Sequence, residues 1–165
     1  MKTIFTFGTQ CMHKIQKNKE EFFIQLLKDN HIDAVIDVRL RSEPRLAKFA
    51  KGENIKNLVE QNNIKYIHEV KDNLVVFAPT ANMLTRHRSY KKGENNYHWG
   101  KYTEDYLKLL KERKALVVWD EIAVNFSRPC LLCAEPKAEE CHRCLLAEYL
   151  KKHKRASEII HLPEK

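Results

Sequence analysis

Apolar residues along the chain alternate between short strand-like runs and segments with helical spacing. Residues 2–8 alternate apolar and β-forming side chains and end at Gly8, which predicts a first strand followed by a turn. The run DAVIDV, residues 33–38, is the kind of short apolar segment that is buried in a parallel sheet. Further strands are predicted over residues 66–68, 130–134 and 157–162.

Helical spacing predicts most of the segments between these strands. In residues 18–30, apolar side chains recur at Phe22, Phe23, Leu26 and Leu27, and Asn18 is the expected N-cap. Further helices are predicted over residues 53–63, from a capping Thr103 onward, and over residues 141–153.

Residues 116–124 fit either element. Their Val-rich start is typical of a strand, whereas the spacing of Trp119, Ile122 and Phe126 favours a helix. We predict a helix, because the strand at this point of the chain is already assigned to residues 130–134.

The middle of the chain is less regular. Residues 40–52 contain Pro44, Gly52 and four basic residues, and we interpret them as an exposed loop. Residues 74–79 are apolar, and the basic, aromatic residues 86–102 that follow are predicted to be irregular. We interpret residues 71–102 as an insertion in the domain.

Strands separated by helices predict a single α/β domain, with a mainly parallel sheet and helices on both faces. Ligands of such sheets bind beyond the carboxyl ends of the strands. Polar and reactive residues follow the predicted strand ends and are expected to share one crevice: Gly8, Thr9, Asp37, Arg39, His68, Glu69, Cys133 and Glu135.

Composition narrows the classes of protein. The chain has 165 residues, of which 43% are hydrophobic and 32% charged, which is typical of a globular domain. No apolar run is long enough to cross a membrane, and the N-terminus has no long apolar region that would indicate a signal peptide. Five cysteines, an odd number, argue against a secreted disulfide framework and predict a cytoplasmic protein. A net charge of +8 favours an anionic small molecule or nucleic acid as partner, although a solvated Lys-rich surface would give the same balance.

Four of the five cysteines lie in residues 128–150, where a strand, a polar loop and a helix are predicted. Cys141 is expected near the helix N-terminus, where backbone N–H groups and the adjacent His142 and Arg143 favour a thiolate or a bound phosphate. Glu135 is a candidate general acid or base. The alternative is that Cys133 and Cys141 are small buried hydrophobic side chains.

Asp37 and Arg39 follow a buried strand, where a charged pair is well placed for a crevice. Asp37 is expected to orient Arg39, which would then bind an anionic group in a bidentate manner. The alternative is a structural ion pair between the strand and a helix.

Zinc is the main rival interpretation of the cysteines. Cys130, Cys133, Cys141 and Cys144 form two CxxC pairs, a ligand set with tetrahedral precedent. No other cofactor is predicted. Under this alternative the protein is a non-catalytic, zinc-stapled module that binds nucleic acid.

Residues 86–102 combine basic side chains with Tyr90, Tyr97, Trp99 and Tyr102. Basic groups that neutralise phosphates and aromatic rings that stack on bases are the ingredients of single-strand binding. A lid over the crevice would have the same composition.

Five segments form a pattern along the chain: TFGTQ (6–10), IDAVIDVR (32–39), LLCAE (131–135), CHRC (141–144) and IIHL (159–162). In these segments the chain resembles the uncharacterised domain-of-unknown-function 488 family (DUF488). LLCAE followed closely by CHR is the specific part of this signature, and Gln10 stands where the family pattern has serine. The resemblance implies an α/β fold and a site built from these segments, but no particular reaction.

The leading hypothesis from the sequence is an enzyme, a hydrolase or transferase, that acts on a nucleotide or nucleic-acid substrate in the strand-end crevice. Its candidate catalytic residues are Asp37, Cys133, Glu135, Cys141 and His142. Its candidate substrate-binding residues are Thr9, Arg39, Tyr97, Trp99 and Arg143. A weaker alternative is thiol-based sulfur transfer.

Overall fold

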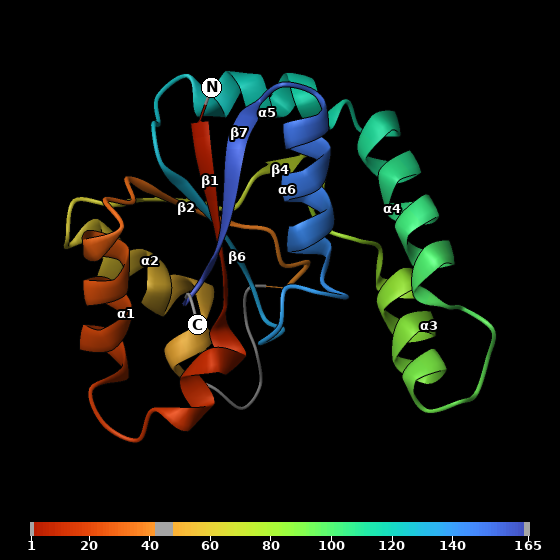
Figure 1. Cartoon of the computed structure of the whole chain (residues 1–165), viewed down its shortest axis with the longest axis horizontal. Helices are drawn as coiled ribbons and strands as arrows, with labels where there is room; N and C mark the ends of the chain where they lie inside the picture. The colour runs from red at the N-terminus through yellow and green to blue at the C-terminus, as the bar shows by residue number, and fades with distance from the viewer. Residues whose placement is uncertain (1, 42–47, 164–165) are drawn as a thin grey trace.

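The computed structural model describes residues 2–41 and 48–163 of the chain (Figure 1). The strands are β1 (Lys2–Gly8), β2 (Ala34–Asp37), β3 (Lys65–Ile67), β4 (Val70–Lys71), β5 (Leu74–Val75), β6 (Pro129–Cys133) and β7 (Ala156–Leu162). The α-helices are α1 (Lys19–Asp29), α2 (Gly52–Glu60), α3 (Ala81–Lys91), α4 (Trp99–Glu112), α5 (Ala115–Ala123) and α6 (His142–Lys152). Two short 3-10 helices are η1 (Thr9–Lys14) and η2 (Lys48–Ala50).

Five strands form one sheet in the order β3-β2-β6-β1-β7, and every neighbouring pair in it is parallel. β4 and β5 pair with each other as a separate antiparallel ribbon. The predicted α/β class with a mainly parallel sheet is therefore confirmed. Because β1 and β6 are adjacent with Gly8 opposite Cys133, their carboxyl ends lie at the same edge of the sheet.

Each face of the sheet has its own core, as expected when helices cover both faces. One core joins Phe5, Phe7, Cys130 and Leu132 to α1 and α2. The other joins Leu131 and Cys133 to the helices α4, α5 and α6. Figure 1 shows these two groups of helices on opposite sides of the sheet, with α3 beside α4 at the outer edge.

The prediction that residues 86–102 are irregular holds for residues 92–98 but is wrong for residues 86–91 and 99–102, which belong to α3 and α4. Thr80 caps α3, because its hydroxyl accepts a hydrogen bond from the Met83 backbone N–H at 3.1 Å. α4 begins at Trp99 and not at Thr103, since the His98 ring accepts a hydrogen bond from the Lys101 N–H and ends the loop earlier. The apolar side chains of both helices then pack against each other.

The other element predictions fare differently. The helix predicted over residues 116–124 is confirmed as α5, which ends at Ala123, and the helix and strand segments around the cysteines are confirmed. Asn18 is the N-cap residue of α1, as predicted, but its side chain makes no capping hydrogen bond and its φ of 56° is left-handed. Residues 42–47 of the predicted exposed loop lie outside the described residues, and Lys48–Ala50 form η2. Among the described residues, no helix is both long and apolar enough to span a membrane.

Candidate functional site

A pocket of about 510 Å³ lies beyond the carboxyl end of β6. Its walls come from the tips of β2 and β6, from η1, from α3 and from the first residue of α6. The side chains that give it chemical character are Arg39, Arg41, Arg88, Cys133, Glu135 and His142. The strand-end crevice expected from the sequence is therefore present, and it carries three arginines against one carboxylate.

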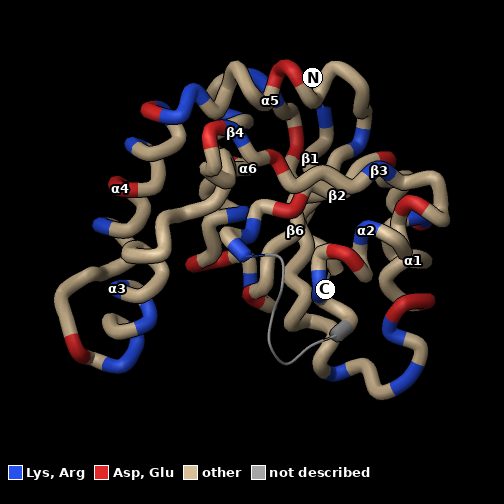
Figure 2. Tube along the Cα trace, turned by 180° about the vertical axis from the view of Figure 1, so that it is seen from behind, with Lys and Arg blue, Asp and Glu red and all other residues tan. Residues whose placement is uncertain are grey.

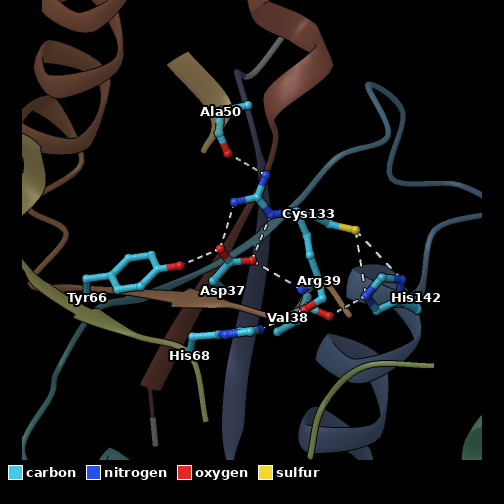
Figure 3. A network of polar contacts seen from close by, with 8 residues as sticks. All are labelled: Asp37, Val38, Arg39, Ala50, Tyr66, His68, Cys133 and His142. Atoms are coloured by element: carbon cyan, nitrogen blue, oxygen red, sulfur yellow. Dashed lines mark hydrogen bonds and ion pairs between the residues drawn. The ribbon is translucent and has the colours of Figure 1, made fainter. Parts of the chain in front are cut away.

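The Asp37–Arg39 pair forms a buried network beside this pocket (Figure 3). Arg39 Nε and Nη2 donate to the two carboxylate oxygens of Asp37 at 2.9 and 2.8 Å. The Tyr66 hydroxyl donates to the same carboxylate at 2.6 Å, and Arg39 Nη1 donates to the Ala50 carbonyl at 2.7 Å. Burial first, and then the neighbouring Asp37 carboxylate, raise the pKa of Tyr66 well above its ordinary value, so the hydroxyl stays a donor.

This network occupies the bidentate edge of Arg39. The Nε–Nη2 edge that was expected to bind an anion is engaged by Asp37, and Asp37 itself is 1% exposed. The geometry matches the alternative of a structural ion pair, here one that ties β2 to β3 and to the segment at Ala50. Arg39 still lines the pocket, held in one orientation.

Two thiols and an imidazole lie together beside the pocket, and two of these residues, Cys133 and His142, line it. Cys133 Sγ lies 3.7 Å from His142 Nδ1 and 3.6 Å from His142 Nε2 (Figure 3). The thiol of Cys141 completes the group, since the ligand atoms of all three residues lie within 4.8 Å of one another. All three residues are buried, at 3%, 2% and 6% exposure for Cys133, Cys141 and His142.

The two thiols differ in their readiness to ionise. The hydrogen bond from Cys133 holds the pKa of the Cys141 thiol well below its ordinary value, and the neighbouring His142 and Arg143 act in the same direction. The same hydrogen bond, together with burial, raises the pKa of Cys133. The pair therefore favours a single thiolate, on Cys141 at the N-cap of α6, with the thiol of Cys133 donating to it.

Arg143 braces the loop between β6 and α6 and does not reach the pocket walls. Its guanidinium is 1% exposed and donates to the Glu135 carbonyl at 2.6 Å and toward the Thr6 hydroxyl at 3.4 Å. Gly8 makes this arrangement fit, because a Cβ at that position would lie 1.7 Å from the Glu135 carbonyl oxygen. Arg143 thus contributes positive potential near the thiols and positions the loop that carries Glu135.

The four cysteines of the zinc alternative do not come together. Cys130 and Cys133 are three residues apart in β6, so their side chains point to opposite faces of the sheet and belong to different cores. Cys144 is half-buried on α6. Among the described residues, one group of His, Cys, Asp or Glu side chains could hold a metal ion, and it consists of the buried residues Cys133, Cys141 and His142. The predicted ligand set is therefore wrong for Cys130 and Cys144.

Three other predicted binding residues are not among those that line the pocket. Thr9 is buried at the start of η1. Tyr97 is 2% exposed, donates to Asp105 at 2.8 Å and is covered by Arg86, whose guanidinium lies 3.9 Å from the ring centre. Trp99 stacks on Tyr102 with ring centres 4.7 Å apart. His87 of α3 contacts both Trp99 and Tyr102, at ring-centre distances of 5.4 and 5.1 Å, so these rings join α3 to α4.

The sequence analysis missed eight of the residues that line the pocket, and three of them have long polar side chains. Gln10, Arg41 and Arg88 all line it, and Arg88 reaches it from α3. Arg88 belongs to the basic segment noted in the sequence. The sequence does not distinguish it from the neighbouring basic residues, because the helix α3 decides which of their side chains faces the pocket.

Comparison with known proteins gives one family. A family model described as "Domain of unknown function DUF488" matches residues 19–150, a range that contains β2, β6 and the first nine residues of α6. No curated protein and no solved structure matches the chain.

Proposed function

The chain belongs to the DUF488 family, whose function is unknown, and from the chemistry of its own pocket we propose that it is an enzyme acting on a phosphate-bearing small molecule such as a nucleotide. The observation that carries this proposal is one pocket that combines the cations Arg41 and Arg88 with the carboxylate of Glu135 and the Cys133–His142 pair. Cations bind the anionic part of the substrate, and the remaining groups supply reactive side chains.

The size of the pocket favours a small molecule over a polymer. Its volume of about 510 Å³ falls in the range of roughly 300–1,000 Å³ that is typical of small-molecule sites. Two of the four aromatic residues that would stack on the bases of a single strand are buried, because Tyr97 and Tyr102 are each 2% exposed. Figure 2 shows Lys and Arg spread over many elements and mixed with Asp and Glu, with no single basic stripe along the chain.

Arg41 and Arg88 are the residues proposed to bind phosphate. Both are exposed and line the pocket, so their donors can reach a ligand without first breaking a buried ion pair. Arg39 contributes a fixed positive charge whose orientation Asp37 sets. Glu135 is exposed at the same wall and can act as a general acid or base.

Binding is the first test of this proposal. Substitution Arg88→Gln should weaken binding of nucleotides about 10- to 100-fold, because a hydrogen bond to a charged group contributes roughly 1.5–3 kcal/mol. Lys91→Gln is the matched control: it removes one positive charge from an exposed position on the same helix, and it does not line the pocket. Isothermal titration of a panel of nucleoside mono-, di- and triphosphates measures both. Equal losses in the two variants would contradict a specific phosphate site.

Turnover is the second test. In a screen of the same panel for hydrolysis or group transfer, Glu135→Gln should lower kcat by about 10²–10⁴-fold, the range for general acid–base catalysis. Glu139→Gln removes an equally exposed carboxylate from the same loop, outside the pocket, and should leave kcat unchanged. A Glu135→Gln variant with unchanged kcat would remove Glu135 from the chemistry.

A further inference from the structure

We propose that Cys133, Cys141 and His142 bind one divalent, thiophilic metal ion, Zn²⁺, whose fourth coordination position faces the pocket. This differs from the four-cysteine staple considered for the sequence in both its ligands and its role, since it leaves a position open. The role of the ion rests on the proposed function, because the ion would act on the substrate bound in the same pocket. Metal binding itself is argued from the three side chains alone.

The distances fit a tetrahedral ion. Zinc binds sulfur at about 2.3 Å and imidazole nitrogen at about 2.0–2.1 Å, so a sulfur and a nitrogen on one tetrahedral ion lie about 3.6 Å apart. Cys133 Sγ is already 3.7 Å from His142 Nδ1. All three ligand atoms lie within 4.8 Å of one another, so modest side-chain rotations would bring them onto a shared ion.

The imidazole presents the correct nitrogen. His142 Nε2 lies 2.7 Å from the Val38 carbonyl oxygen, as Figure 3 shows. A carbonyl oxygen can only accept, so Nε2 carries a proton, and in the neutral ring Nδ1 then offers its lone pair to a ligand. Metal-bound histidines regularly donate their other ring N–H to a backbone carbonyl or carboxylate, which fixes the ring and its tautomer. The Val38 contact supplies this outer-shell bond.

The backbone holds the three ligands in place without an ion. Cys133 ends β6, and Cys141 and His142 open α6. The loop between them is tied down at Ala134, whose carbonyl accepts from the Gln10 N–H at 2.9 Å, and at Glu135, whose carbonyl accepts from Arg143. Two thiolates would neutralise the charge of a divalent cation in this buried position.

The open coordination position follows from the donor count. Among the described residues, no fourth His, Cys, Asp or Glu joins the group. Cys133 and His142 both line the pocket, so an ion between them would be reached from the pocket side. Three protein ligands and one exchangeable position are characteristic of catalytic zinc, whereas structural zinc has four protein ligands. The ion would act as a Lewis acid toward a substrate oxygen beside Glu135.

The test uses the full chain, purified under reducing conditions, stripped of metal and titrated with Zn²⁺ or Co²⁺. We expect elemental analysis by mass spectrometry to find one bound ion per chain. The Co²⁺ form should show thiolate-to-metal charge-transfer absorption with the intensity of two thiolates, a readout that needs no variant. Cys133→Ala, Cys141→Ala and His142→Ala should each weaken binding by at least 10-fold, in line with the loss of a ligand.

Two matched controls separate this site from the sequence-based alternative. Cys130→Ala and Cys144→Ala remove neighbouring thiols of the same segment and should leave affinity and absorption unchanged. Absence of a bound ion, four-thiolate absorption, or loss of binding in the Cys130 or Cys144 variant would each overturn the inference. Circular dichroism of every variant confirms that it is folded.

The two proposals fail separately. If nucleotide binding still depends on Arg88 but no metal binds, the metal site is refuted and the proposed function stands. If one ion binds through Cys133, Cys141 and His142 but no phosphate-bearing ligand binds, the metal site stands and the proposed substrate class is refuted.

Discussion

Asp37→Asn provides a demanding test of how the site is held together. The Asp37 carboxylate accepts hydrogen bonds from Arg39 Nε, from Arg39 Nη2 and from the Tyr66 hydroxyl, and the ion pair's side chains are 6% exposed for Arg39 and 0% for Asp37. The substitution keeps the side-chain size and removes the negative charge. It leaves the Arg39 guanidinium in the same buried place without its carboxylate partner.

The expected loss is large. Breaking a buried ion pair by removing one partner costs about 3–5 kcal/mol, because the remaining charge is desolvated without compensation. Domains of ordinary stability have only about 5–15 kcal/mol in total. We therefore expect the urea midpoint of Asp37→Asn, followed by far-ultraviolet circular dichroism, to fall by about a fifth or more.

The chain offers a matched control at its surface. Arg155 makes the same bidentate contact with Asp120, at 3.0 and 2.6 Å, but the side chains there are 33% and 50% exposed. Asp120→Asn should cost no more than about 1 kcal/mol, as for other solvent-exposed pairs. If Asp37→Asn and Asp120→Asn lose the same free energy of unfolding, burial does not govern the Asp37–Arg39 interaction and the reasoning is refuted.

A second substitution identifies the source of the loss. In Asp37→Asn/Arg39→Met the uncompensated charge is gone, so part of the lost stability should return. A double variant no more stable than Asp37→Asn alone would assign the loss to packing.

Two further predictions concern the strand end and the α3–α4 contact. Gly8→Ala should cost at least about 1–3 kcal/mol by overpacking, because its Cβ would lie 1.7 Å from the Glu135 backbone oxygen. Gly100→Ala, in the first turn of α4, is the control and should lower the melting temperature less, because its Cβ would meet only the exposed His98 ring, at 3.1 Å. Equal melting temperatures for the two variants would contradict the tight contact at Gly8. Burial, followed by the nearby charge of Lys91, lowers the pKa of His87 below 6.5. The unfolded chain therefore binds the proton more readily, so the stability that neutral His87 gives above pH 6.5 is lost as the pH falls through its lowered pKa. Urea midpoints between pH 7 and 5 should fall less steeply in His87→Phe, and parallel slopes would count against this assignment.

The residue pattern alone determined the class of fold. Short apolar runs separated by helical spacing predicted parallel strands with helices between them, because each element must bury one face or both. The pattern also predicted that Asp37, Arg39, Cys133 and Glu135 would meet, since the carboxyl ends of parallel strands share an edge. The register of β1, β6 and β2 then brings these strand tips side by side.

The spacing of Cys130 and Cys133 already argued against a shared metal ion, although the four cysteines together matched the number of zinc ligands. Residues three apart in a strand point to opposite faces, so the strand predicted over residues 130–134 already separates Cys130 from Cys133. The CxxC spacing suits a metal site in a loop or turn, but not one in the body of a strand. The zinc interpretation failed at Cys130 for this reason.

Only the tertiary structure decided which side chains reach the pocket and which are buried elsewhere. Arg88 lines it because α3 lies beside the strand tips, while Tyr97, a few residues later, packs beneath Arg86. Arg39 is engaged by Asp37 because both lie buried beside Tyr66. Contacts between segments distant in sequence depend on how whole elements pack, and the identity of a residue does not specify that packing.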